Sequence, residues 1–397
     1  MSTPPIIAPE IDDTADRATD AVRYVEEPRQ LVGGNAAFLL HNGADAFPAM
    51  LEAIAAARER ISMEMYIFND GVIGDRFANA LAAAAARGVN VRLLYDFIGS
   101  RDASPDFFAR LRERGVHVIA YHVYRLWRPR FWVLFRRNHR KTLVVDGQRA
   151  FTGGINVSDE WLARSEGGDD WRDLMVELRG PAVSLIERSF AAVWNRRARK
   201  RLRLTLAGLQ PAPAAGTTQV AVIANTERRD RFAIRRTALH AIREARRRIY
   251  LANPYFVPDP GILRALRRAA ARGVDVRVLV PERSDFRFLD YAARATFVRL
   301  LRDGVRIFQH QAVVHSKVLV VDDVFFSIGS YNFDHRSLAY TLELVVNIID
   351  PATATAAAVI TSNDMADASE IDRAAFARRP FFARLVERIA YRLRHWL

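Results

Sequence analysis

The chain has 397 residues, a formal net charge of +14 and a pI near 10.6. It contains no cysteine, which excludes disulfides, thiolate metal sites and cysteine nucleophiles. The length is sufficient for two domains, and the positive charge favours a negatively charged partner: nucleic acid, an anionic membrane surface or a phosphorylated substrate.

Residues 1–33 are acidic, contain proline and have little hydrophobic periodicity, so they are predicted to form an N-terminal tail. They lack the basic start and the apolar run of a signal peptide. No stretch in the chain reaches the roughly 18 uninterrupted apolar residues of a membrane-spanning helix. We therefore expect a cytoplasmic protein that is attached peripherally to the inner membrane.

Helical and strand-like segments alternate after this tail. The pattern predicts helices near 47–58, 74–87 and 105–114, and strands near 61–68, 89–95 and 116–120. Strands separated by helices are typical of βαβ units. We therefore expect an α/β fold whose mixed, largely parallel sheet is flanked by helices.

The second half of the chain repeats the first. The sequence A-R-G-V-N-V-R-L-L at 86–94 returns as A-R-G-V-D-V-R-V-L at 271–279. A repeat of this length indicates two copies of one α/β unit, related by a pseudo-twofold axis. The predicted domains span 34–209 and 210–368, with the boundary in a linker rich in proline and alanine that begins at residue 210.

A histidine motif occurs once in each copy. His139, Lys141, Asp146 and the pair 153–154 are followed by Asn156, and His315, Lys317, Asp322 and the pair 329–330 are followed by Asn332. Every position is offset by 176 residues (315 minus 139, 322 minus 146, 332 minus 156). A single His-x-Lys would most simply be a solvated strand end, but two matching copies favour a catalytic site.

The spacing within each motif separates two roles. Residues two apart on a strand face the same way, so His139 and Lys141 are expected to project together, as are His315 and Lys317. Asp146 lies on the opposite face, and the same holds for Asp322. We therefore expect these two aspartates to be structural, tying the turn that follows. The small pairs at 153–154 and 329–330 allow the backbone to approach closely.

The two copies, placed face to face, form one site at the domain interface. Displacement at a phosphodiester needs a nucleophile, a proton for the leaving oxygen and positive donors for the other oxygens. One imidazole can attack and form a phosphohistidine while the other protonates the leaving alcohol. Lys141, Lys317, Asn156 and Asn332 can stabilise the charge, so neither a metal nor another cofactor is required.

Three acidic residues are further candidates for this site. A nucleophilic imidazole needs its other nitrogen held, usually by a carboxylate. Asp173 and Glu343 lie in matching places downstream of the motifs, and Asp173 is the expected orienting carboxylate for the first motif; either could instead be a surface acid. Glu64, on an apolar strand, is a weaker substrate-binding candidate or a satisfied structural acid.

Two basic and apolar segments favour a membrane surface. From Gly115 to His139 is 24 residues and from Gly304 to His315 is 11, so the first copy carries about 13 extra residues before its histidine. Trp127 and Trp132 alternate there with arginines across 124–137, which suits an anionic interface or a half-buried flap and makes the two tryptophans weak substrate-binding candidates. Residues 369–397 contain a basic amphipathic helix that could pack on the domain or lie in the membrane plane.

The duplicated motif resembles that of the phospholipase D superfamily. The segments W-R-D-L-M-V-E-L-R-G-P-A-V at 171–183 and N-P-Y-F-V-P-D at 253–259 resemble bacterial cardiolipin synthases, here of a short form without transmembrane helices. The resemblance implies transfer of a phosphatidyl group from one phosphatidylglycerol to the glycerol headgroup of another. It also implies that His139 is the nucleophile and His315 the acid and base.

Two other classes use the same features. A phospholipase D or nuclease-type phosphodiesterase could employ the same site, and its positive charge would suit DNA. A non-catalytic module that binds membranes or nucleic acid is a third alternative. The aromatic insert and the C-terminal helix favour lipid over nucleic acid, and the sequence pattern does not set an oligomeric state.

Overall fold

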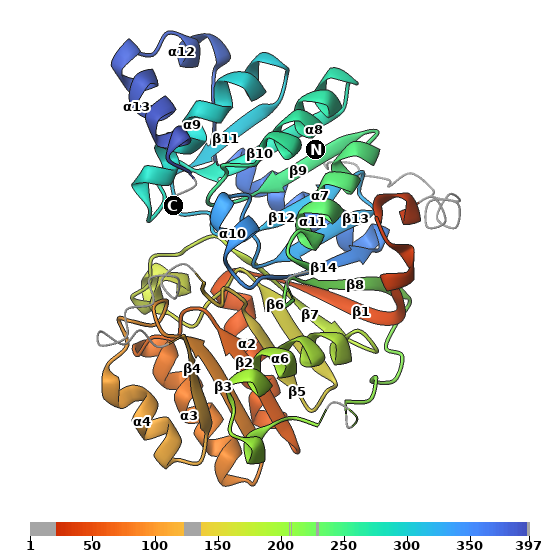
Figure 1. Cartoon of the computed structure of the whole chain (residues 1–397), viewed down its shortest axis with the longest axis vertical. Coiled ribbons are helices and arrows are strands. Elements are labelled where there is room, and N and C mark those ends of the chain that lie inside the picture. The colour runs from red at the N-terminus through yellow and green to blue at the C-terminus, as the bar shows by residue number, and fades with distance from the viewer. Residues whose placement is uncertain (1–20, 123–135, 206, 208, 228–229, 395–397) are drawn as a thin grey trace, which may run out of the picture.

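The computed structural model describes residues 21–122, 136–205, 207, 209–227 and 230–394, and the statements below concern this part of the chain. Figure 1 shows two lobes that meet along a central sheet. The elements of the first half are β1 (Val32–His41), α2 (Asn42–Ala56), β2 (Arg60–Met65), α3 (Val72–Ala86), β3 (Asn90–Asp96), α4 (Pro105–Glu113), β4 (His117–Tyr121), β5 (Thr142–Val145), β6 (Arg149–Gly153), β7 (Leu174–Arg179) and α6 (Val183–Arg197).

The second half repeats this order and adds a C-terminal extension. Its elements are β8 (Thr218–Ala224), α7 (Ala233–Glu244), β9 (Arg248–Ala252), α8 (Pro260–Ala271), β10 (Asp275–Pro281), α9 (Arg287–Arg302), β11 (Arg306–His310), β12 (Val318–Val321), β13 (Phe325–Gly329), α10 (His335–Ala339), β14 (Leu344–Ile349), α11 (Pro351–Ala366), β15 (Ser369–Glu370), α12 (Arg373–Ala377) and α13 (Phe381–Arg392). Local sequence explains the sharp starts of α8 and α11, where Asp259 and Asp350 accept from N–H groups of the first turn and a proline follows each.

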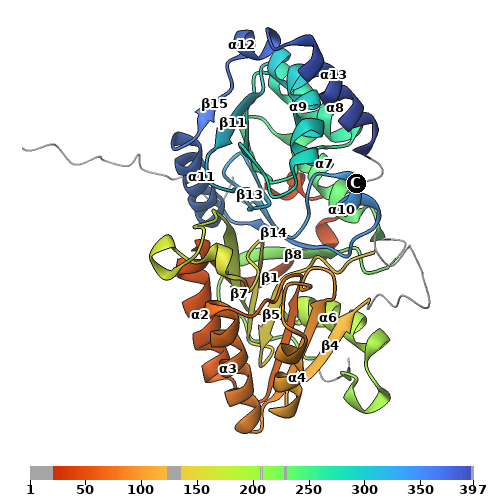
Figure 2. The same ribbon diagram turned by 90° about the vertical axis from the view of Figure 1, so that its left-hand side faces the viewer.

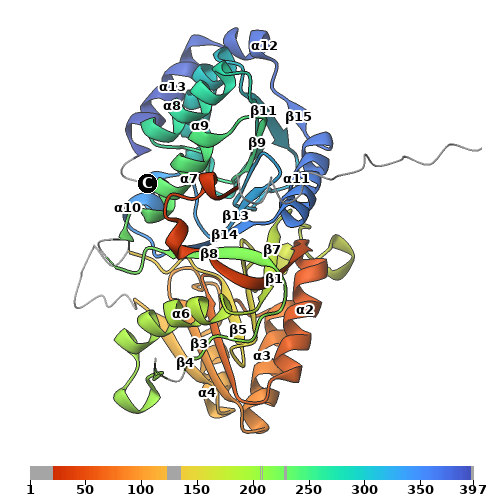
Figure 3. The same ribbon diagram turned by 90° about the vertical axis from the view of Figure 1, so that its right-hand side faces the viewer.

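The strand order has twofold symmetry. All strands of the described residues form one sheet in the order β15-β11-β10-β9-β12-β13-β14-β8-β1-β7-β6-β5-β2-β3-β4. The two copies therefore meet where β1 pairs with β8, antiparallel and with a register shift between Val32 and Asn35. Figure 3 shows β8 and β1 side by side at the junction of the two lobes. Helices α2 and α7 cover one face of the sheet and α6 and α11 the other, so the symmetry operation preserves the two faces.

The mixed sheet flanked by helices is confirmed, but the expectation that it is largely parallel is wrong. Parallel pairing among the described strands is confined to β2-β3-β4 and β9-β10-β11. The strands after each histidine motif return by short turns, as in the β5–β6 pair, and therefore pair antiparallel. Three helices, α2, α3 and α4, bury their apolar faces on the first half, and α7, α8 and α9 do the same on the second.

Part of the expected N-terminal tail belongs to the fold. Two short 3-10 helices, Val22–Tyr24 and Pro28–Gln30, precede β1. Ala21, Tyr24 and Val25 are buried in the core of the second half, and the Tyr24 hydroxyl donates to Asp322 Oδ2 at 2.7 Å. The chain thus contacts the second copy before it enters the first.

Candidate active site

The two histidine motifs lie in extended segments that precede β5 and β12, not within the strands themselves. Each segment pairs with the opposite half through an isolated parallel bridge, Asn138 with Leu342 and Val314 with Arg172. The His139 N–H donates to the Leu342 carbonyl at 3.0 Å, and the His315 N–H donates to the Arg172 carbonyl at 2.8 Å. The main chain of each half therefore fixes the histidine segment of the other.

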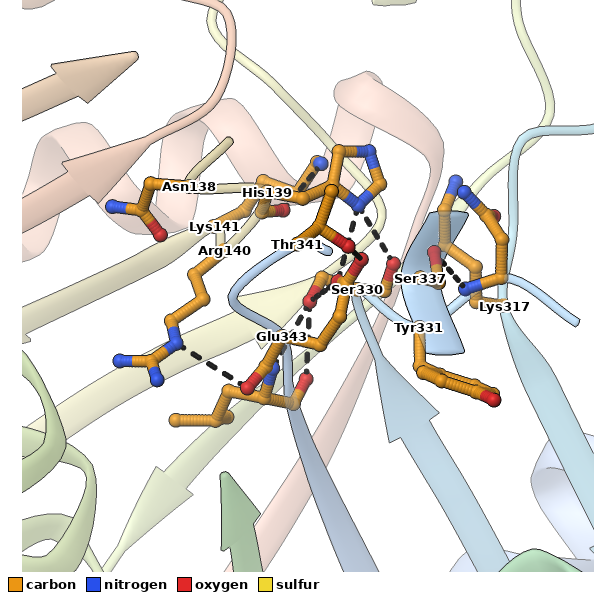
Figure 4. A network of polar contacts seen from close by, with 12 residues as sticks. Asn138, His139, Arg140, Lys141, Lys317, Ser330, Tyr331, Ser337, Thr341 and Glu343 are labelled. Atoms are coloured by element: carbon orange, nitrogen blue, oxygen red, sulfur yellow. Dashed lines mark hydrogen bonds and ion pairs between the residues drawn. The ribbon is translucent and has the colours of Figure 1, made fainter. Parts of the chain in front are cut away.

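The orienting carboxylates follow the same crossed pattern. His139 Nδ1 lies 3.1 Å from Glu343 Oε2 and 3.0 Å from the Ser330 carbonyl (Figure 4). His315 Nδ1 lies 2.8 Å from Asp173 Oδ2. The expectation that Asp173 orients the first histidine is therefore wrong. Asp173 directly precedes β7 next to Arg172, and the bridge from Arg172 to Val314 brings it to the histidine of the second motif.

Hydrogen bonds hold both carboxylates as acceptors. Thr341 Oγ1 donates to Glu343 Oε1 at 2.6 Å and the Ser330 hydroxyl donates to Oε2 (Figure 4). Trp161 Nε1 donates to Asp173 Oδ2 at 2.9 Å. Burial opposes ionisation of these groups, but the neighbouring histidines and these donors outweigh it and hold the pKa of Asp173 and the pKa of Glu343 below their ordinary values.

The two carboxylates differ in length, and the small residues behind them differ to match. Ser330 places its hydroxyl on the longer Glu343. At the equivalent position 154 a Cβ would lie 2.1 Å from Asp173 Oδ1, so only glycine leaves room for the shorter acid. At Gly153 and Gly329 a Cβ would meet the backbone of the neighbouring strand, at 2.4 Å from the Leu174 carbonyl oxygen and 2.1 Å from that of Leu344. The close backbone approach expected for these pairs is present.

The two lysines are buried beside the histidines. Lys141 Nζ donates to the His139 carbonyl at 2.8 Å and lies 5.0 Å from the centre of the Tyr66 ring. Lys317 Nζ donates to the His315 carbonyl and lies 2.9 Å from His315 Nδ1. Burial lowers the pKa of Lys317 to about 8, and burial together with the charge of Lys317 lowers the pKa of Lys141 well below its ordinary value.

Burial favours the neutral form of both imidazoles. Burial lowers the pKa of His139 to about 4, although Glu343 opposes the shift. Burial and the charge of Lys317 lower the pKa of His315 to about 3. Aromatic rings enclose both groups, with the centre of the Tyr66 ring 4.7 Å from that of His139 and the Trp161 ring 5.1 Å from that of His315. These walls keep water away and leave the imidazole lone pairs available.

The two asparagines lie next to the motifs with unused hydrogen-bonding capacity. Asn156 Oδ1 accepts from the Ile67 N–H at 3.0 Å, while its Nδ2 is buried and has no partner within the described residues. Asn332 donates from its backbone N–H to Ser337 Oγ at 3.3 Å, and its Oδ1 likewise lacks a partner there. A buried, unpaired amide group is costly unless a ligand completes it.

Asp146 and Asp322 bind backbone N–H groups and lie apart from the histidines and lysines. Both have positive φ, 52° and 53°, in the turns after β5 and β12. Asp146 accepts from the backbone N–H groups of 58, 59 and 60 at 2.8 to 2.9 Å. Asp322 accepts from those of 246, 247 and 248 at 2.7 to 2.8 Å. Each aspartate thus ties the turn to the start of a neighbouring strand, β2 or β9.

Glu64 is buried next to the first histidine motif and binds the side chain of Asn138. It is 1% exposed and accepts from Asn138 Nδ2 at 2.6 Å, beside the Arg140 guanidinium. Burial raises its pKa. A side chain enclosed in this way positions Asn138 and is not placed to contact a substrate. Trp127 and Trp132, the other weak candidates, lie outside the described residues.

Several residues of the site carry no motif in the sequence. Tyr66 and Trp161 enclose the histidines, and Asn225 accepts from the Glu343 backbone N–H at 2.7 Å and donates to the Thr341 carbonyl at 2.9 Å. Arg140 reaches back to donate to the Glu343 carbonyl at 3.3 Å (Figure 4). Their only sequence cue is position: Tyr66 and Asn225 directly follow strands and Arg140 lies between two motif residues, whereas Trp161 has no such cue.

This arrangement defines a class of protein. Two neutral imidazoles, each held by a carboxylate from the other half, and two lysines suit displacement at a phosphodiester through a covalent phosphohistidine. The family model described as cardiolipin synthase, PLD-like domain, matches residues 50–194 and 238–365. The chain belongs to this family.

Curated relatives and solved structures agree with this assignment. The chain is 38% identical to cardiolipin synthase A of Pseudomonas entomophila over 342 residues, which is 86% of this chain and 70% of that protein. It is 36% identical to the cardiolipin synthase of Geobacillus thermodenitrificans over 375 residues, 93% of this chain and 74% of that one. A phosphatidylserine synthase of Haemophilus influenzae has the same fold, with a TM-score of 0.69 at 14% identity over 98% of this chain and 100% of the other.

Proposed function

We propose that the chain is a phosphatidyltransferase that makes cardiolipin from two molecules of phosphatidylglycerol. The observation that carries the proposal is the crossed pair of carboxylate-held histidines, because it supplies a nucleophile and a proton donor within one buried site. The relatives named cardiolipin synthase, which align with most of the chain, direct that chemistry to phospholipid.

The surroundings of the two Nδ1 atoms support different roles. Among the described residues, the hydrogen-bond partners of His139 Nδ1 are acceptors, Glu343 and the Ser330 carbonyl, which favour the Nδ1–H tautomer and leave the Nε2 lone pair free to attack. His315 Nδ1 lies near an acceptor, Asp173, and a donor, Lys317. Asp173 can accept from the Nδ1–H of the imidazolium, the form that gives up its Nε2 proton, and the neutral form that remains can take a proton back.

In the first displacement, His139 Nε2 attacks the phosphorus of one phosphatidylglycerol. The P–Nε2 bond forms as the bond from phosphorus to the headgroup glycerol oxygen breaks. His315, which enters this step as the imidazolium, gives its Nε2 proton to that oxygen and becomes neutral. Glycerol leaves. Lys141, Lys317 and the Nδ2 group of Asn156 face the non-bridging oxygens, where charge builds up.

In the second displacement, His315 takes the proton from the terminal hydroxyl of another phosphatidylglycerol. The hydroxyl oxygen bonds to phosphorus as the P–Nε2 bond breaks, which releases cardiolipin and restores His139. Both displacements need the phosphate to enter a site that already contains two lysines. Its negative charge opposes the effect of these lysines on the pKa of His315 and so raises that pKa toward a useful range.

Peripheral attachment to an anionic inner membrane fits the outer face of α13. Helix α13 packs on α9 through Glu387 and Ala390, which are buried. Its apolar residues point away from the protein: Phe381, Phe382, Leu385, Val386 and Ile389, of which Phe382 is 77% exposed. Arg388 and Arg392 are exposed on the same helix. An apolar stripe with flanking arginines suits the interface of an anionic bilayer.

The position of α13 supports this orientation. In Figure 2, α13 lies on the same side of the molecule as α10, which follows Asn332 of the second motif, and opposite α11. A membrane on this side would meet the half that holds the acid and base. No helix among the described residues is both long and apolar enough to cross a bilayer.

The test is reconstitution with phosphatidylglycerol vesicles in the presence of a chelator. We expect cardiolipin and glycerol in equal amounts from the native chain, and neither from His139→Ala. Trapping a phosphorylated species at His139 in a His315→Ala variant would support the order of steps. Formation of phosphatidic acid alone would redefine the protein as a phospholipase D, and the absence of any lipid product would refute the proposal.

A further inference from the structure

A cavity of about 570 Å³ opens between the two halves, next to the active site. Its wall includes Tyr121 at the end of β4, the C-terminal end of α6, the segment after β8, and the residues that follow α10. The catalytic steps proposed above do not use it. It is large enough to hold a phosphodiester with part of a glycerol headgroup.

The cavity is strongly basic. Among the described residues that line it are Arg136, Arg196 and Arg197 from the first half, Arg231 from the second, and one acid, Glu227. Arg196 donates to the Thr226 carbonyl at 3.2 Å, and the Arg197 guanidinium lies 5.0 Å from the centre of the Tyr121 ring. Each guanidinium has five N–H donors, so these contacts orient the groups and leave donors for an anion.

The cavity shares a wall with the catalytic centre. Thr341 and Leu342 line it. Thr341 Oγ1 donates to the carboxylate of Glu343, and the carbonyl of Leu342 accepts from the N–H of His139. The backbone of Thr341 and Leu342 separates a group bound there from the nucleophilic histidine.

The arginines of the cavity are not part of the repeat that the two halves share. With the offset of 170 between Asp173 and Glu343 (343 minus 173), Arg196 and Arg197 correspond to Ala366 and Asp367. Arg136 lies at the end of the extra residues that only the first copy has. Because both copies already supply the shared phosphate-displacement chemistry, a basic cavity on one side is suited to a second anion.

We propose that this cavity binds the phosphodiester of the acceptor lipid, the second phosphatidylglycerol. The inference rests on the proposed function and deepens it. The phosphate of the donor lipid binds Lys141 and Lys317. The acceptor lipid brings a second negative charge, which needs other cations. Binding that charge beside Thr341 places the terminal hydroxyl of the acceptor near the phosphohistidine, and favours it over water and small alcohols, which have no phosphate to bind.

The experiment compares two acceptors in one assay. Phosphatidylglycerol vesicles are supplied with ethanol, and the ratio of cardiolipin to phosphatidylethanol is measured for the native chain and for Arg197→Gln/Arg231→Gln. Loss of two charge-assisted contacts is expected to lower this ratio by about tenfold or more. Arg197→Lys/Arg231→Lys, which retains the charge, should recover part of it.

The matched control is Arg199→Gln/Arg203→Gln, which removes the same charge from exposed positions near α6 but outside the cavity. Its ratio should equal that of the native chain, which separates a local contact from a general loss of attraction to the vesicle. An unchanged ratio in the cavity variant, or an equal fall of both products, would overturn the inference. If the native chain forms phosphatidylethanol but no cardiolipin, the proposed function itself fails; a fall of the ratio in the variant alone leaves that function standing and supports the acceptor site.

Discussion

Nδ1 of His139 lies 3.1 Å from Oε2 of Glu343, although 204 residues separate them in the chain. The reciprocal contact, from His315 to Asp173, spans 142 residues. Each half therefore provides one reactive nitrogen and the carboxylate that fixes the reactive nitrogen of the other. The following predictions depend on this exchange and on the surfaces around it.

Glu343→Gln should lower kcat for cardiolipin formation by about 10²- to 10⁴-fold. An amide can donate to Nδ1 of His139 and so stabilise the tautomer whose Nε2 carries the proton and cannot attack. Steady-state assays with phosphatidylglycerol vesicles measure the effect, and circular dichroism confirms that the variant is folded. A folded variant with native kcat would show that His139 does not depend on the carboxylate.

The alkaline limb of the pH profile should report on Lys317. Its pKa is lowered to about 8, so the ammonium is present below that pH and is lost as the pH rises through it. We expect kcat/KM to fall above about pH 8, and the fall to move to higher pH in Lys317→Arg, which remains protonated. A limb that stays in place in Lys317→Arg would assign it to another group.

The acid limb should lie well below neutrality. Burial lowers the pKa of His139 to about 4, so the neutral imidazole persists until the pH approaches that value and is lost below it. The rate of phosphohistidine formation, measured by rapid quench with labelled donor, should therefore stay near its maximum at pH 5.5, where a histidine of ordinary pKa would be mostly protonated. A fall centred near pH 6.5 would contradict the burial of His139.

Asp146→Ala should destabilise the fold by about 1–3 kcal/mol, because three backbone N–H groups lose their common acceptor. Urea denaturation measures the change. The specific activity of the folded protein should be retained, since Asp146 does not contact the reacting groups. Asp322→Ala should cost more, because it also leaves the buried Tyr24 hydroxyl without its acceptor. Loss of activity in a stable Asp146→Ala protein would show that Asp146 takes part in the reaction.

Phe382→Glu/Ile389→Glu should weaken binding to anionic vesicles, because it places two charges on the exposed apolar stripe of α13. Vesicle flotation with phosphatidylglycerol-rich liposomes measures the loss. The matched control is Val359→Glu on α11, which is 52% exposed and lies on the opposite side of the molecule (Figure 2). Equal flotation of both variants and the native chain would exclude α13 as the attachment surface.

The internal repeat made much of the fold predictable. The two copies of A-R-G-V with matching strands predicted the α/β class and the pseudo-twofold, and the strand order and the two matched segments of the family model agree. Strand parity separated Asp146 from His139 without any structure. The direction of the strands after each motif was harder, because a short apolar run carries no mark of parallel or antiparallel pairing.

The crossed pairing could not be predicted because a repeat is compatible with both arrangements. Asp173 is near His139 in sequence and far from His315, so sequence proximity favoured the wrong partner. The bridge between Arg172 and Val314 decides the outcome, and it is a tertiary contact without a local pattern. Similarly, the burial of Tyr24 depends on a pocket in the second half, which residues 1–33 alone cannot reveal.

The exchange of carboxylates also makes the chemistry conditional on complete assembly. During synthesis the first half emerges with His139 but without Glu343, so a nascent or truncated chain has no correctly held nucleophile. Activity should appear only when β14 has docked beside β8 and brought Glu343 across. A phosphatidyltransferase built in this way is therefore inactive until both halves are in place, and damage to either half abolishes its activity.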